Sequence, residues 1–106
     1  MMEGIKGIKR YKMEDIITTL RSFKTDMIAR YKLRTIGLFG SFARNQQHPS
    51  SDVDLLVDFQ DGADLFDLIG LSQFLEERLQ RPVDVVPRRA LREELRDAVL
   101  QEVIIL

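Results

Sequence analysis

The chain has 106 residues, 44% of them hydrophobic, which supports one domain with a single core. Sixteen basic and seventeen acidic residues give a formal net charge of −1, so bulk charge does not predict nucleic-acid binding. Cysteine is absent, which excludes disulfides, thiolate metal sites and cysteine nucleophiles. No apolar run reaches the roughly 18 residues of a membrane span, and the start lacks the apolar core of a signal peptide. We therefore expect a soluble, cytoplasmic protein.

The first predicted element is an amphipathic helix that begins at residue 13. Apolar residues recur at helical spacing over residues 13–31, with charged residues between them. Residues 1–12 carry four basic side chains, which indicate a flexible, solvated terminus or, alternatively, a contact to RNA or a phosphate group. We therefore predict a flexible basic N-terminus over residues 1–12 and a single domain over residues 13–106.

Three short apolar segments follow, and each predicts a strand. Residues 35–39 and 53–59 are bounded by turn residues and are typical of interior strands. Asp64 is placed to cap the next helix, residues 82–86 predict a third strand, and residues 91–102 predict a last helix. This order of elements predicts an α/β (α+β) fold, in which helices flank a small mixed sheet.

The chain ends on four apolar residues, 103–106. Such a segment can complete the core as a final strand or plug. It can equally form a contact patch for a protein partner. Both interpretations are open at this stage.

Two aspartates lie one residue apart where the second predicted strand begins. Asp52 and Asp54 project to the same side because side chains alternate along a strand, although Asp52 could instead cap the preceding turn. Two ionised carboxylates repel each other, and hard oxygen ligands in this arrangement suit Mg²⁺ or Mn²⁺. Asp84 lies among apolar residues, where burial without a partner is costly; an edge strand would simply expose it. We predict that Asp52, Asp54 and Asp84 hold one or two metal ions and are catalytic.

A Gly-Ser step follows the first predicted strand. Gly40 permits close approach of the backbone, and residues 41–45 are expected to open a short helix whose N–H groups attract phosphate. Ser41 could add a hydroxyl hydrogen bond, and Arg44 could reach a phosphate or steady the acidic cluster. Gly-Ser alone is a common turn, but an Asp-x-Asp pair after ten further residues favours a nucleotide-binding site. His48, the only histidine, lies in a predicted loop and is assigned no chemistry.

These motifs resemble the signature of the DNA polymerase beta-like nucleotidyltransferase superfamily, in which Asp84 of PVDVV resembles the third carboxylate. The stretches GSFAR, SDVDLLVDF and RPVDVV are similar to the minimal nucleotidyltransferases, especially the MntA-type antitoxins, over about residues 13–106. Many relatives carry glycine after the arginine of GSFAR, whereas this chain has Asn45. Asparagine tolerates left-handed backbone geometry, so the loop is expected to keep its shape.

The resemblance implies the minimal nucleotidyltransferase fold and an Mg²⁺-dependent transfer of AMP from ATP to a tyrosine of a HEPN-domain toxin, HepT, which is thereby neutralised. It implies that Asp52 and Asp54 hold Mg²⁺ and that Asp84 completes the metal site and takes the acceptor's proton. Gly40 and Ser41 would hold the triphosphate. The alternatives are a non-catalytic module that neutralises its partner by stoichiometric contact, and nucleotide transfer to a small molecule or an RNA end. We expect a protein partner and no contact with membranes or nucleic acid. The sequence is compatible with a homo-oligomer or a hetero-oligomer.

Overall fold

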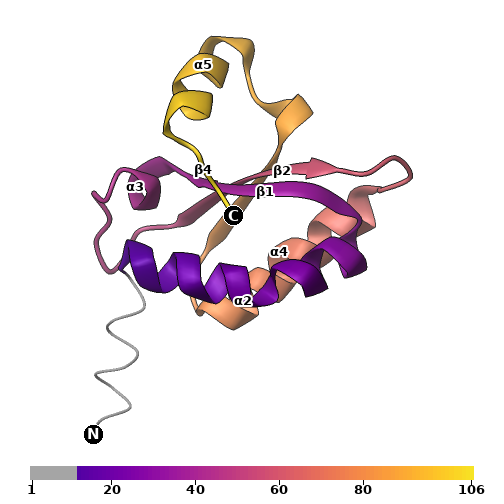
Figure 1. Ribbon diagram of the computed structural model, residues 1–106, viewed down its shortest axis with the longest axis horizontal. Helices are drawn as coiled ribbons and strands as arrows, with labels where there is room; N and C mark the ends of the chain where they lie inside the picture. Colours follow the sequence, from indigo (N-terminus) through magenta and orange to yellow (C-terminus); the bar gives the residue numbers. More distant parts are fainter. Residues whose placement is uncertain (1–11) are drawn as a thin grey trace, which may run out of the picture.

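The computed structural model describes residues 12–106, and its helices and strands follow the order predicted from the sequence (Figure 1). The predicted flexible N-terminus therefore lies outside the described residues, except for Lys12. The elements are α2 (Met13–Tyr31), β1 (Leu33–Phe39), α3 (Gly40–Ala43), β2 (Val53–Phe59), α4 (Leu65–Leu79), β3 (Val83–Pro87), the 3₁₀ helix η1 (Arg88–Ala90), α5 (Glu93–Glu102) and β4 (Ile104–Ile105).

The four strands form one mixed sheet in the order β3-β2-β1-β4. β1 pairs antiparallel with both β2 and β4, whereas β2 pairs parallel with β3 through the crossover helix α4. The two strands predicted to be interior, β1 and β2, hold the central positions. The prediction of a small mixed sheet flanked by helices is confirmed.

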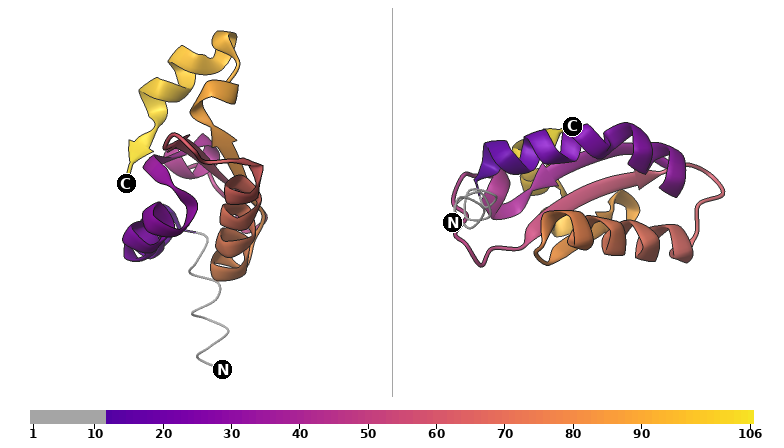
Figure 2. Two further views of the ribbon diagram at one scale, coloured as in Figure 1. Left: turned by 90° about the vertical axis from the view of Figure 1, so that its right-hand side faces the viewer. Right: turned by 90° about the horizontal axis from the view of Figure 1, so that it is seen from below.

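Helices α2 and α4 lie side by side over one face of the sheet (Figure 2). Their apolar side chains, including Leu20, Met27 and Leu75, pack with Ile36 and Leu55 of the sheet in a single core. α5 projects on the other side of the sheet, and none of its own residues is buried. Among residues 12–106, no helix combines the length and the apolar composition needed to cross a membrane.

Three elements have boundaries that differ from the predicted ones by one or two residues. β1 begins two residues earlier because Leu33 pairs with Phe59 at the end of β2. β3 begins one residue later because Pro82 has no N–H group to contribute to the ladder. α5 begins at Glu93, since the short helix η1 and a buried leucine occupy the preceding residues.

The apolar end of the chain is a strand and a core plug. β4 pairs with β1, and the N–H of Leu106 donates to the carbonyl of Ile36 at 3.0 Å. Leu106 is only 8% exposed, so the interpretation as a final strand that completes the core is confirmed. Ile105 is 62% exposed, and its use as a contact for a partner stays a prediction.

The predicted cap at Asp64 is confirmed. Its carboxylate accepts from the N–H groups of Phe66 at 2.9 Å and Asp67 at 3.2 Å, and the Asp67 carboxylate accepts from the Asp64 N–H at 3.0 Å. This reciprocal capping box fixes where the crossover helix α4 begins, and β3 follows that helix beside β2.

Candidate active site

The parallel pairing of β2 with β3 places Asp54 directly opposite Asp84. Asp54 is half-buried, whereas Asp84 is exposed because β3 is an edge strand. The edge strand exposes Asp84, as one of the sequence alternatives anticipated, while its pairing with Asp52 and Asp54 in a metal site stays a prediction. Asp84 nevertheless remains the direct neighbour of Asp54 across the ladder.

The other two predicted aspartates, Asp52 and Asp84, both act electrostatically on Asp54. Burial raises the pKa of Asp54 to about 6, and the negative charges of Asp84 and Asp52 contribute to this rise. The Arg44 guanidinium lowers this pKa, while the charge of Glu102 contributes to raising it. Asp52 itself is exposed and lies just before β2. The three carboxylates thus form one electrostatic cluster at the start of β2.

Gly40 lies against this cluster and has two reasons to be glycine. Its φ angle of +75° is in the left-handed region that L side chains rarely adopt. A Cβ atom on Gly40 would also overlap with the Oδ2 atom of Asp54. The close backbone approach predicted at Gly40 is therefore present, and the group that approaches is the Asp54 carboxylate.

The turn after Gly40 differs in extent from the predicted helix. α3 covers Gly40–Ala43 rather than residues 41–45, and half-buried Ser41 is its second residue. Asn45 follows with a φ angle of +55°. This confirms the expectation that asparagine supplies left-handed geometry where many relatives have glycine.

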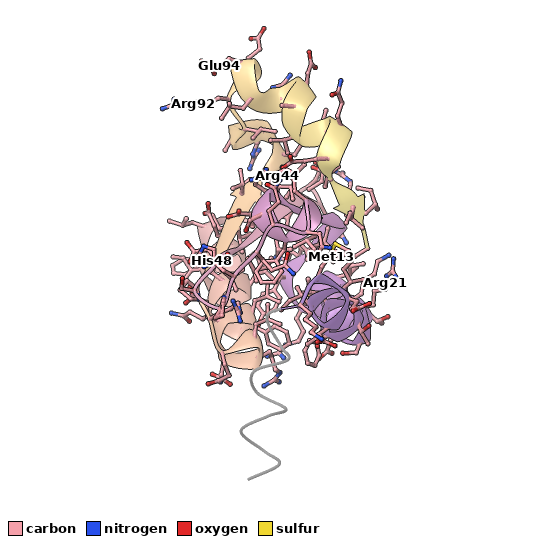
Figure 3. The ribbon with its side chains drawn as sticks, turned by 90° about the vertical axis from the view of Figure 1, so that its left-hand side faces the viewer. Met13, Arg21, Arg44, His48, Arg92 and Glu94 are labelled. Carbon is pink, nitrogen blue, oxygen red and sulfur yellow. The ribbon has the colours of Figure 1, made fainter. Side chains whose placement is uncertain are left out.

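Arg44 and Gly40 share one partner that sequence analysis missed, Glu102 at the end of α5. The Gly40 N–H donates to Oε2 of Glu102 at 2.8 Å, and Arg44 Nη1 donates to Oε1 and Oε2 at 3.1 and 3.3 Å. Arg44 lies at the junction of α3 and α5 (Figure 3). A signal was present in the sequence, because an acidic residue at a helix C-terminus is opposed by the helix dipole.

Arg81 is a second residue that the sequence did not single out. Its Nη1 atom donates to the carbonyls of Ser51 at 2.8 Å and Pro49 at 3.3 Å, immediately before Asp52. Its guanidinium carbon lies 5.3 Å from the ring centroid of the fully buried Phe42. Burial lowers the pKa of Arg81, and the charge of Asp52 opposes that change. Arg81 therefore ties the loop that carries Asp52 to the core.

Replacing Arg81 with methionine should lower the free energy of unfolding by about 1–2 kcal/mol, because two carbonyls lose their donor. Urea denaturation at neutral pH measures this loss. Arg92→Met is the matched control, since Arg92 is exposed at the start of α5, and should change stability by less than about 0.5 kcal/mol. Equal stability of the two variants would contradict the anchoring role of Arg81.

The carboxylate cluster offers the ligand atoms of a metal site, but its side chains are not arranged around one ion position. Within residues 12–106, no three His, Cys, Asp or Glu side chains are arranged so that they would hold an ion as they stand. Asp52 and Asp84 are exposed and free to change rotamer, and carboxylate oxygens are the ligands that Mg²⁺ prefers. The metal-binding roles of Asp52, Asp54 and Asp84 stay predictions.

A concave region of about 250 Å³ lies at the opposite end of the sheet. Arg34, Arg88 and Arg89 line it together with the carboxyl-terminal ends of β2 and β3. None of the site residues predicted from the sequence contributes to it. This concave region is therefore separate from the carboxylate cluster.

Residues 20–106 match the nucleotidyltransferase domain family. This chain belongs to that family. As a nucleotidyltransferase it is 37% identical over 92 residues to the protein adenylyltransferase MntA of Thermococcus cleftensis, across 87% of this chain and 93% of that relative. The family predicted from Gly40-Ser41 and the aspartate pair is confirmed.

Solved structures of similar proteins share the fold of this nucleotidyltransferase. A structure assigned as a minimal nucleotidyltransferase is 36% identical with a TM-score of 0.79, over 90% of this chain and 96% of that one. A chain of a toxin–antitoxin complex with AMP-PNP is 33% identical with a TM-score of 0.65, over 88% and 70%. A chain of the complex between the tri-AMPylated HEPN toxin of Shewanella oneidensis and its MNT antitoxin is 30% identical with a TM-score of 0.57, over 88% and 66%.

Proposed function

We propose that this nucleotidyltransferase is an Mg²⁺-dependent protein adenylyltransferase that transfers AMP from ATP to a tyrosine of a HEPN-domain toxin and so neutralises it. One observation carries the proposal: the Asp54 carboxylate lies against the backbone of Gly40 and opposite Asp84. The identity to an MntA adenylyltransferase over 87% of the chain supports the reaction. The AMP-PNP complex and the AMPylated HEPN toxin among similar structures support the substrate and the partner.

The nucleotide would bind where β1 turns into α3. The Gly40 N–H and the Arg44 guanidinium are donors that suit phosphate oxygens, and Ser41, the next residue of α3, would add its hydroxyl group. Asp52, Asp54 and Asp84 are the residues that would hold Mg²⁺. When bound, the ion would offset the repulsion among these carboxylates and the charge of the triphosphate.

The transfer step requires an in-line attack at the α-phosphorus. The tyrosine hydroxyl oxygen forms a bond to the α-phosphorus, the bond to the β-phosphate oxygen breaks, and pyrophosphate leaves with that electron pair. Asp84 takes the hydroxyl proton in this proposal. Its exposed place on the edge strand makes it accessible to a tyrosine that a second protein presents.

Intact-mass measurement tests the proposal. A candidate HEPN-domain partner is incubated with the chain, ATP and Mg²⁺, and its mass is compared with that from a reaction that uses Asp52→Asn. We expect a gain of one or more AMP groups with the wild-type chain and none with the variant. A partner that is bound and inhibited without any change of mass would overturn the proposal and establish stoichiometric neutralisation instead.

A further inference from the structure

Glu102 holds the two donors that the proposed function gives to the nucleotide. One oxygen of its carboxylate accepts from the Gly40 N–H at 2.8 Å, and both oxygens lie within 3.1–3.3 Å of Arg44 Nη1. A backbone N–H together with a guanidinium is a donor set that also suits phosphate oxygens. The Glu102 carboxylate therefore occupies a position where a phosphate group would be expected.

We propose that Glu102 is a built-in competitor of the nucleotide, which binds the Gly40 N–H and the Arg44 guanidinium until a phosphate group of ATP displaces it. The inference rests on the proposed function, because it concerns the same two donors. It adds a residue from the C-terminal part of the chain, and a step in which Glu102 must leave before the nucleotide can bind fully.

The surroundings of Glu102 favour its release. It is the last residue of α5, where the helix dipole opposes a negative charge. Gly40, whose N–H it accepts from, lies against the Asp54 carboxylate, so the negative charges of Glu102 and Asp54 are near each other. The C-terminal end of α5 and the nearby Asp54 carboxylate both disfavour a negative charge at Glu102, and the Gly40 N–H and the Arg44 guanidinium are the donors that hold it.

The structure allows the end of α5 to move without unfolding the core. None of the residues of α5 is buried, and the helix projects from the sheet (Figure 1). The chain after it is held independently, because Leu106 bonds to Ile36 and its carbonyl accepts from Lys24 Nζ at 2.7 Å. Release of Glu102 is therefore expected to loosen the last turn of α5 and to leave β4 in place.

Binding of AMP-PNP with Mg²⁺, measured by calorimetry, tests the competition. Glu102→Gln keeps the size of the side chain but removes its charge, and it should bind the analogue about three- to tenfold more tightly than the wild-type chain. Glu94→Gln removes a charge from the exposed first turn of the same helix, and it should change affinity by less than about twofold. Unchanged or weaker binding by Glu102→Gln would overturn the proposal and make Glu102 a residue that positions the two donors.

Inorganic tripolyphosphate and amide exchange separate this inference from the proposed function. Tripolyphosphate should show the same preference for Glu102→Gln, because the competition concerns phosphate alone. AMP-PNP should speed amide exchange at the end of α5 in the wild-type chain, and Glu102→Gln should exchange fast there without ligand.

Slower amide exchange at the end of α5 on binding of AMP-PNP would overturn the competition even if AMP transfer occurs. Failure of every variant to bind AMP-PNP would overturn the proposed function as well. If Glu102→Gln does not fold, Glu102→Asp, which is too short to reach both donors, takes its place.

Discussion

Replacing Asp54 with asparagine should lower AMP transfer sharply and, at the same time, stabilise the ligand-free protein at pH 8. Burial and the charges of Asp84 and Asp52 raise the pKa of Asp54 from 3.8 to about 6. The folded state therefore binds this proton more tightly than the unfolded chain does, and its contribution to stability is lost as the pH rises through about 6. At pH 8 the ionised carboxylate costs the fold free energy that asparagine does not.

The size of this effect can be bounded. The full change in pKa corresponds to about 3 kcal/mol, but Asp54 is only half-buried and solvent screens its charge. We expect Asp54→Asn to raise the free energy of unfolding by about 1–2 kcal/mol at pH 8. The difference from the wild-type chain should close near pH 4, where the carboxyl group is protonated in the folded state. Urea denaturation at the two pH values measures both.

The activity of Asp54→Asn should fall by about 100-fold or more, because the amide cannot supply the anionic oxygen proposed to hold Mg²⁺. Asp58→Asn is the matched control, since Asp58 is a half-buried aspartate near the other end of β2. It should retain activity and lack the gain in stability at pH 8. A variant at Asp54 that keeps normal AMP transfer would contradict the assignment of this residue. Loss of activity together with higher stability is the result that a structural role for Asp54 could not produce.

The sequence predicted the elements and the family well because the signals involved are local. The apolar spacing of α2, the cap at Asp64 and the alternation along β2 each depend on neighbouring residues. The charge of Asp52 acts on Asp54 although Asp52 lies just before β2, so its place beside Asp54 stays a prediction from the alternation. Gly40 could be predicted to permit close approach, but the approaching group could not be named, since Asp54 reaches it only through the pairing of β1 with β2.

Tertiary contacts between distant segments could not be predicted in the same way. The exposure of Asp84 depends on which strand lies at the edge of the sheet, and strand order is not encoded in the spacing of one strand. Glu102, near the C-terminal end of the described chain, accepts from the Gly40 N–H. Arg81, which follows the crossover helix, donates to the carbonyl of Ser51, which precedes it. Each of these contacts joins residues at least 30 positions apart in the chain.

Replacing Gly40 with alanine should damage both the fold and the site. The left-handed backbone of Gly40 costs an alanine about 1–2 kcal/mol, and its Cβ would overlap with the Asp54 carboxylate, which must then move. We expect a loss of at least about 2 kcal/mol in the free energy of unfolding, and about 100-fold in AMP transfer, because small displacements of catalytic groups are costly. Urea denaturation and the mass assay measure the two losses.

Gly62 provides the control that separates backbone strain from the contact with Asp54. Its φ angle of +90° is equally left-handed, yet nothing lies within 4 Å of the position of an added Cβ. Gly62→Ala should therefore show the strain alone and leave AMP transfer unchanged. In an Asp54→Ala background, the cost of Gly40→Ala should fall toward that of Gly62→Ala, because the overlapping carboxylate is gone and only the 3.2 Å approach to the Cβ atom of residue 54 remains. If Gly40→Ala costs the same in both backgrounds, the packing of Gly40 on Asp54 is not what requires glycine at this position, and φ alone accounts for it.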